Sequence, residues 1–294
     1  MLFEDPQWPR ASAWLQFGHG DRAALGVVGL PVNRSITPGR CDLAPAAIRD
    51  ALIRFSLGDL TLGGCLEDLP LHDYGDVSES DHSLAKILTK HEACVILGGD
   101  NGVTPYGVKA LNRPLNSIGL LTIDAHFDLR DVGLGVMNGN PVRRLLADGL
   151  PGENIVQIGL QSFANSDAYA KVAREAGIAI FTAEKAHDLG METCMSRALG
   201  LLESRCEVIY VDLDLDVMDM AFAPGCPGAR PGGITPLELR RAARTAGLHP
   251  MVKVLDVVEL DPTRDVRDQT SLAAAACLLE FAAGLRQRLE AQGA

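Results

Sequence analysis

Residues 118–130 read IGLLTIDAHFDLR, a run that begins apolar and ends in alternating acidic and imidazole side chains. The apolar part predicts a strand that is covered on both faces within a parallel sheet. Because alternate side chains of an extended segment share one face, we expect Asp124, His126 and Asp128 to converge. Oxygen and nitrogen donors gathered on one face predict a metal site.

Residues 208–216, VIYVDLDLD, follow the same pattern of an apolar run that ends in alternating acidic side chains. Asp212, Asp214 and Asp216 alternate at the end of an apolar run, and no Lys or Arg lies among them. Three such carboxylates repel one another, and a divalent cation removes that cost. The donors favour manganese, iron or zinc over magnesium alone, and several carboxylates can bridge two ions.

The order of the predicted elements indicates the fold class. Apolar strand patterns alternate with helical ones, and no internal repeat or linker divides them, so we expect one domain over residues 1–294. Its architecture should be a three-layer α/β/α fold with a mostly parallel central sheet, in which the acidic strand ends share one edge. Thr235 to Glu238 predict a helix start with a capping box. The first 24 residues, with Trp8 and Trp14, are expected to form a surface arm that packs on a neighbour.

Composition limits the partners and the compartment. A formal net charge of −11 argues against nucleic acid and anionic membranes as partners. Seven cysteines, an odd number without a CxxC pair, indicate reduced thiols and a cytoplasmic location. The sequence begins without a signal-peptide pattern and contains no apolar run of about 20 residues, so we expect no membrane span.

Several motifs in the same order resemble the ureohydrolase family, which includes arginase, agmatinase and formimidoylglutamase. The most specific is DAHFD at 124–128. The others are the loop and helix start at 38–49, GGD at 98–100, DLDVMD at 214–219 with the glycine-rich loop at 223–233, and VVELDP at 257–262.

The resemblance implies one or two Mn²⁺ ions as cofactor, and it implies which residues hold them. The ligands would be Asp124, His126, Asp128, Asp214 and Asp216, with Asp124 and one of the last two bridging the ions. Asn101 stands where the family has a histidine ligand, so we expect that position to bind a cation more loosely. Asp212 is expected to support the site.

Catalytic roles are also carried over from the resemblance. Asp128 is expected to take a proton from the attacking water, and Glu259 to hold the amidinium through charge-assisted hydrogen bonds. Asn138 replaces a histidine that many members have before Gly-x-Pro. Together with Asn140, it is expected to contact the substrate.

The motif DAHFDLR at 124–130 is more similar to formimidoylglutamase than to the other members. N-formimidoyl-L-glutamate carries two carboxylates and therefore needs cations in its pocket, a role that suits the forked guanidinium of arginine. Arg130 and Arg143 are the candidates for substrate binding, and Arg144 and Arg34 are the nearest alternatives.

The leading hypothesis is hydrolysis of N-formimidoyl-L-glutamate to L-glutamate and formamide, as in histidine degradation. A guanidino hydrolase that releases urea is the second. The third is a metal-poor relative that binds a ligand without turnover, which Asn101 and Asn138 suggest. The resemblance also implies a homo-oligomer.

Overall fold

A computed structural model describes residues 5, 7–16, 23–61, 63–79, 83–133 and 135–293, and its centre is a parallel β-sheet. The eight strands found in these ranges lie in the order β2-β1-β3-β8-β7-β4-β5-β6. Every neighbouring pair is parallel. The strands are β1 Leu25–Leu30, β2 Leu71–Asp76, β3 Ala93–Gly98, β4 Ile118–Ile123, β5 Ile155–Leu160, β6 Ala179–Thr182, β7 Val208–Asp214 and β8 Val252–Val258.

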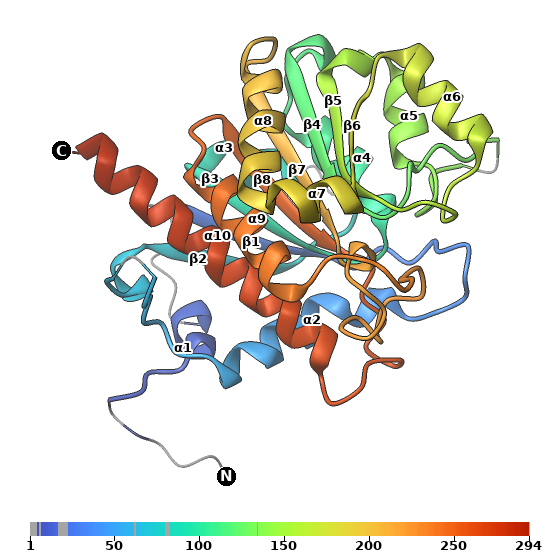
Figure 1. Cartoon of the computed structure of the whole chain (residues 1–294). Helices are drawn as coiled ribbons and strands as arrows, with labels where there is room; N and C mark the ends of the chain where they lie inside the picture. The colour runs from blue at the N-terminus through green and yellow to red at the C-terminus, as the bar shows by residue number, and fades with distance from the viewer. Residues whose placement is uncertain are drawn as a thin grey trace.

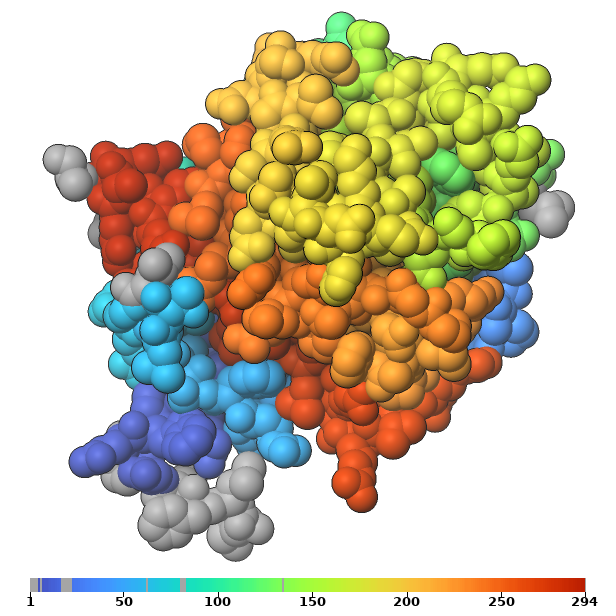
Figure 2. Space-filling view, in the orientation of Figure 1, coloured from blue at the N-terminus to red at the C-terminus, as the bar shows by residue number. Residues whose placement is uncertain are grey.

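Helices cover both faces of the sheet (Figure 1). One face carries α3 Ser83–Lys90, α4 Thr104–Ala110, α5 Pro141–Asp148 and α6 Asp167–Ala176. The other carries α1 Ala11–Gln16, α2 Ala44–Ala51, α7 Ala183–Leu189, α8 Met191–Glu203, α9 Pro236–Leu248 and α10 Gln269–Gly293. In the space-filling view of this second side, the yellow-to-orange segment with α7, α8 and α9 covers the middle of the molecule (Figure 2). The predicted three-layer α/β/α fold is confirmed.

Burial on both faces explains the continuous apolar pattern of the central strand. Leu121 and Ile123 of β4 pack into one hydrophobic core, and Ile118 and Leu120 pack into the other. A strand between two helical layers needs apolar side chains at successive positions, so it does not alternate with polar residues. The predicted capping box is also present, since the Thr235 side chain accepts a hydrogen bond from the backbone N–H of Glu238.

The strand register brings three chemically important strand ends together. Ile123 of β4 pairs with Leu213 of β7, and Asp214 pairs with Val258 of β8. Asp124 and Glu259 directly follow β4 and β8. The carboxyl ends of these neighbouring strands therefore place their acidic residues at one edge of the sheet, where open α/β sheets bind ligands.

The prediction of an N-terminal arm was wrong for Trp14. Trp14 lies on α1, is only 6% exposed, and donates from Nε1 to the carbonyl of Leu69 at 3.2 Å. A helix of six residues is too short to show a clear period in the sequence. The blue N-terminal segment lies against the light-blue chain around Phe55, whose carbonyl accepts from Ala11 N at 3.0 Å (Figure 2). Trp8 is 50% exposed, and residues 1–4, 6 and 17–22 of the predicted arm lie outside the described ranges.

The described helices include none with the length and apolar character needed to cross a bilayer.

Close packing of α9 against α10 yields a stability prediction. A Cβ at Gly284 would lie 2.3 Å from the carbonyl oxygen of Arg244, whereas a Cβ at Gly200 in α8 would meet no heavy atom within 4 Å. We expect Gly284→Ala to lower the free energy of unfolding by about 1–3 kcal/mol through overpacking. The matched Gly200→Ala should raise it by about 0.5–1 kcal/mol, because alanine loses less backbone entropy in a helix. Urea denaturation of both variants measures these changes, and equal effects would contradict the packing argument.

Candidate metal centre

The two acidic strand ends fold locally in the same way. Oδ1 of Asp124 accepts a hydrogen bond from the backbone N–H of His126 at 2.6 Å, and Oδ1 of Asp214 accepts one from the N–H of Asp216 at 2.8 Å. Each aspartate thus binds the backbone two residues ahead, as in an Asx-turn. This bond fixes the first carboxylate and turns the chain so that the next donor points to the same place.

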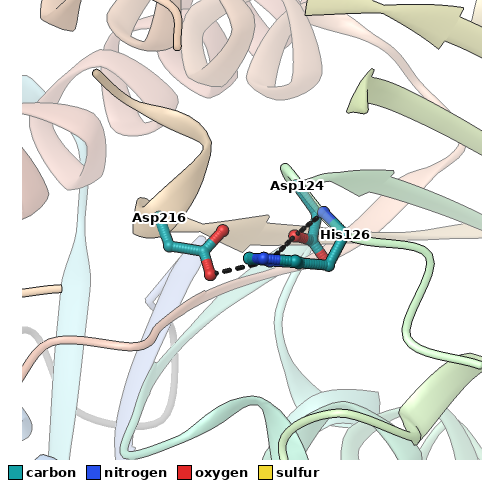
Figure 3. Close-up of side chains that lie close together, drawn as sticks. All are labelled: Asp124, His126 and Asp216. Atoms are coloured by element: carbon teal, nitrogen blue, oxygen red, sulfur yellow. Dashed lines mark hydrogen bonds and ion pairs between the residues drawn. The ribbon is translucent and has the colours of Figure 1, made fainter. Parts of the chain in front are cut away.

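Asp124, His126 and Asp216 form the first cluster, and their potential ligand atoms all lie within 4.8 Å of one another (Figure 3). Nδ1 of His126 is 3.0 Å from Oδ2 of Asp216 and 3.5 Å from Oδ1 of Asp124. Two buried oxygens, Asp124 Oδ2 and Asp216 Oδ1, have no hydrogen-bond partner within the described part of the chain. Buried carboxylate oxygens without donors next to an imidazole fit a divalent cation.

The second cluster is built around Asn101, which follows β3. Its Nδ2 donates to Oδ2 of Asp128 at 2.9 Å and to Oδ2 of Asp214 at 3.2 Å. Its Oδ1 accepts from the hydroxyl of Thr104 at 2.7 Å. All six residues predicted as metal ligands therefore gather at one edge of the sheet, but Asn101 turns its nitrogen toward the carboxylates. Its role as a ligand stays a prediction.

Glu259 lies beside these clusters and is held from two sides. Its Oε1 accepts from the backbone N–H of Asn101 at 2.8 Å, and its Oε2 accepts from Nδ2 of Asn138 at 3.2 Å. Oδ1 of Asn138 in turn accepts from the N–H of Ile36 at 2.9 Å. This bond connects the loop after β1 to the site. Asp128 and Glu259 both have left-handed backbones, with φ of 54° and 68°, a strained conformation for non-glycine residues that concentrates at functional sites.

Burial and mutual repulsion shift the pKa values of the cluster. Burial, reinforced by the charge of Asp216, raises the pKa of Asp124 to about 6. Burial, with the charges of Asp100 and Asp216, raises the pKa of Glu259 to about 8. The Asp216 carboxylate raises the pKa of His126 to about 12. Without a metal ion, the site therefore retains protons to limit its negative charge.

A cavity of about 370 Å³ opens above the two clusters. Its floor includes His126, Asp128 and Glu259, and its rim includes the exposed Arg130 and Arg230. Within the described ranges, neither arginine has a carboxylate at ion-pair distance. The acidic floor suits a cationic group, and the basic rim suits an anionic one.

Four other predicted or alternative residues lie elsewhere. Asn140 is 1% exposed, and its Nδ2 donates to the carbonyls of residues 131 and 135, so it holds its own loop. Arg143 donates to the carbonyl of residue 129 and does not line the cavity. Arg34 and Arg144 form ion pairs with Glu79 and Asp148, respectively. Their charges are therefore balanced by carboxylates of the protein.

Sequence reasoning missed three residues that the structure places at or under the site. Arg230 lines the cavity from the glycine-rich loop, where nothing in the sequence distinguishes it from a solvent-exposed arginine. Thr104 begins α4, a helix that was not predicted. Asp256 is fully buried within β8, and a charged residue inside an apolar strand was the available signal for it.

The raised pKa values predict how stability depends on pH. The folded state holds protons on Glu259 and His126 that the unfolded state has released, so without metal the melting temperature should fall as the pH rises from about 6 to about 8. Mn²⁺ should raise the melting temperature more at pH 8, because fewer protons compete for the same donors. Thermal melts with Mn²⁺ or a chelator test both trends.

Two variants serve as controls for these melts. Asp216→Asn should abolish most of the Mn²⁺-induced rise, whereas Asp167→Asn on the exposed end of α6 should retain it. A rise of equal size at both pH values would count against proton competition.

Comparison with known proteins agrees with this geometry. The chain is 35% identical to the formimidoylglutamase of Halalkalibacterium halodurans over 276 residues, which cover 88% of this chain and 86% of that protein. It is 33% identical to the formimidoylglutamase of Bacillus subtilis, with the same coverage.

Solved structures show the same fold. The crystal structure of the Bacillus subtilis formimidoylglutamase matches with a TM-score of 0.89 and 31% identity, over 97% of this chain and 94% of that one. The Trypanosoma cruzi formiminoglutamase, solved with Mn²⁺, matches with a TM-score of 0.86 and 22% identity, over 96% and 99% of the two chains. The sequence profile of the Arginase family matches residues 23–284. The resemblance inferred from the motifs is confirmed, and the chain belongs to the arginase family.

Proposed function

We propose that this chain is a manganese-dependent hydrolase that converts N-formimidoyl-L-glutamate and water to L-glutamate and formamide. The observation that carries the proposal is a single cavity with an acidic floor and two exposed arginines at its rim. The substrate has the matching charges, an amidinium at one end and two carboxylates at the other. The relatives named formimidoylglutamase support the same assignment.

The residues that would hold Mn²⁺ are those of the two clusters. Asp124, His126 and Asp216 fit one ion, and Asp128, Asp214 and Asn101 fit a second beside it. When bound, the cations neutralise the carboxylates and make water a better nucleophile at neutral pH.

Glu259 is proposed to hold the amidinium group. Its carboxylate faces the cavity, and the bonds from Asn101 and Asn138 fix its plane. A fixed carboxylate accepts N–H bonds from the amidinium without reorganising, which keeps the carbon electrophilic and in place. Asn138 thus serves as a positioning residue for Glu259.

Asp128 is proposed to move the proton. Its Oδ2 lies on the Asn101 side of the site, at the position proposed for the second cation, which leaves Oδ1 for the attacking water. Water adds to the amidine carbon and gives one proton to Asp128. The bond from this carbon to the glutamate nitrogen then breaks, and the proton passes to that nitrogen, so that formamide and glutamate leave.

Arg130 and Arg230 are proposed to bind the two carboxylates of the substrate. Nη1 of Arg230 donates to the carbonyls of Gly228 and Ala229 at 2.7 and 3.2 Å, which orients the guanidinium over the cavity. A positively charged rim would repel the cationic chain end of a guanidino amine such as agmatine. The charge of the rim therefore favours N-formimidoyl-L-glutamate, with its two carboxylates, over a guanidino amine as the substrate.

A substrate panel tests the activity. With Mn²⁺ present, we expect release of formamide and glutamate from N-formimidoyl-L-glutamate, and far slower release of urea from arginine or agmatine. Glu259→Gln should lower kcat/KM by about a hundred-fold, because the amidinium loses a charged partner. Glu67→Gln, on the surface away from the cavity, is the control. Faster urea release than formamide release would reject the proposal.

The arginine assignment predicts a change in KM. Arg130→Gln and Arg230→Gln should each raise the KM for N-formimidoyl-L-glutamate by about ten-fold or more while kcat changes little, because each removes a charge-assisted contact remote from the reacting carbon. Arg143→Gln, whose side chain does not line the cavity, should leave KM near the wild-type value. Steady-state kinetics measure the difference, and equal KM values for all variants would contradict it.

We also propose that the chain is a single-domain protein that works as a homo-oligomer in the cytoplasm. All seven cysteines lie within the described ranges and are free thiols, which supports a reducing compartment. Exposed apolar side chains such as Leu60 and Phe163 support contact with a second copy. Light scattering would measure the assembly.

A further inference from the structure

Thr104 lies directly under Asn101, and the proposed reaction gives it no role. It is 1% exposed, and its Oγ1 is 2.7 Å from Oδ1 of Asn101 and 2.9 Å from Oδ2 of Asp256. A hydroxyl carries only one hydrogen, so it can donate fully to only one of these two acceptors. Two buried oxygens therefore compete for one proton.

Of the two acceptors, Asp256 is fixed in place. Its Oδ2 also accepts from the hydroxyl of Tyr210 at 2.6 Å, and its Oδ1 accepts from the N–H of Leu213 at 3.3 Å. Asp256 is fully buried in the middle of the sheet. The amide of Asn101 is the partner that can change, because a half-turn exchanges its oxygen and its nitrogen.

In this orientation, the amide of Asn101 offsets the charge of two neighbouring carboxylates. Its N–H groups donate to Asp128 and Asp214, and such charge-assisted bonds relieve the repulsion between the two carboxylates. A cation between these carboxylates would face the same N–H groups and be repelled by them. The half-turn brings Oδ1 to the cation and Nδ2 to Oγ1 of Thr104, whose own hydrogen then goes to Asp256.

We propose that Thr104 is a positioning residue that presents the oxygen of Asn101 to the second Mn²⁺, so that binding of this ion and rotation of the amide are one event. The inference rests on the proposed function only for the identity of the ion. The ion must displace two charge-assisted hydrogen bonds, so the second site binds Mn²⁺ more weakly than the cluster of Asp124, His126 and Asp216.

Mn²⁺ titration of the metal-stripped full chain tests the role of Thr104. Calorimetry, with free Mn²⁺ followed by its paramagnetic resonance signal, should resolve a tight and a weak site in the wild type. Thr104→Val keeps the shape but removes the hydroxyl, so it should weaken the second site by about ten-fold, as expected when a buried N–H loses its acceptor. The first site should be unchanged, and Thr104→Ser should restore wild-type binding.

A double-mutant cycle separates this role from general packing. In an Asn101→Ala background, Thr104→Val should not weaken the second site further, because the amide that needs the hydroxyl is absent. Thr104→Ala, which also lacks the hydroxyl but cannot overpack, replaces Thr104→Val if that variant does not fold. Equal second-site affinity in wild type and variant, equal loss at both sites, or a single Mn²⁺ site in the wild type would each overturn the inference.

Turnover of N-formimidoyl-L-glutamate is measured separately in the same preparations. A wild-type protein that binds two Mn²⁺ ions without turnover would reject the proposed function and leave the role of Thr104 standing. Turnover combined with identical Mn²⁺ binding in the wild type and Thr104→Val would support the proposed function and reject the role of Thr104.

Discussion

Repulsion among buried carboxylates is the constraint on which the rest of this structure depends. The ends of β4, β7 and β8 bring Asp124, Asp128, Asp214, Asp216 and Glu259 to one edge of the sheet, and none is more than 7% exposed. Isolated carboxylates buried at this density would be too costly to keep ionised. The site limits the cost with N–H donors, namely the imidazole of His126 and the amide of Asn101. These donors lie where a dication would bind.

The surrounding loops keep this arrangement rigid and closed on one side. Gly228 passes so close to Asp216 that a Cβ there would lie 2.1 Å from Oδ2, so only glycine allows this approach. Asp100 accepts a hydrogen bond from the N–H of Gly102 at 2.9 Å and another from the backbone N–H of Arg34. The second bond joins the turn after β3 to the loop after β1. The bond between Asp100 and the backbone of Arg34 links segments that are 66 residues apart in the chain.

The acidic and basic residues of the cavity lie in separate regions, and this separation determines how a charged ligand is oriented. Acidic groups line the floor, whereas Arg130 and Arg230 lie at the rim on two different loops. A ligand with a cationic end and an anionic end can satisfy both regions only in one orientation, with its cationic end next to the acidic floor. The proposed placement of the amidinium at the floor and of the substrate carboxylates at the rim follows from this separation of charge.

The sequence by itself determined the strands, because continuous apolar runs indicate burial on both faces, and it showed that donors gather after two of them. The turns in which Asp124 and Asp214 bind the backbone two residues ahead, and not the twofold period of a strand, bring these donors together. Motif order further indicated the family, and it placed Glu259 among the candidate site residues. Tertiary structure alone decided that Trp14 belongs to the core, that Asn140 and Arg143 hold their own loop, and that Arg230 and Thr104 reach the site. Such contacts depend on how distant loops and helices pack, and no periodicity along the chain encodes those distances.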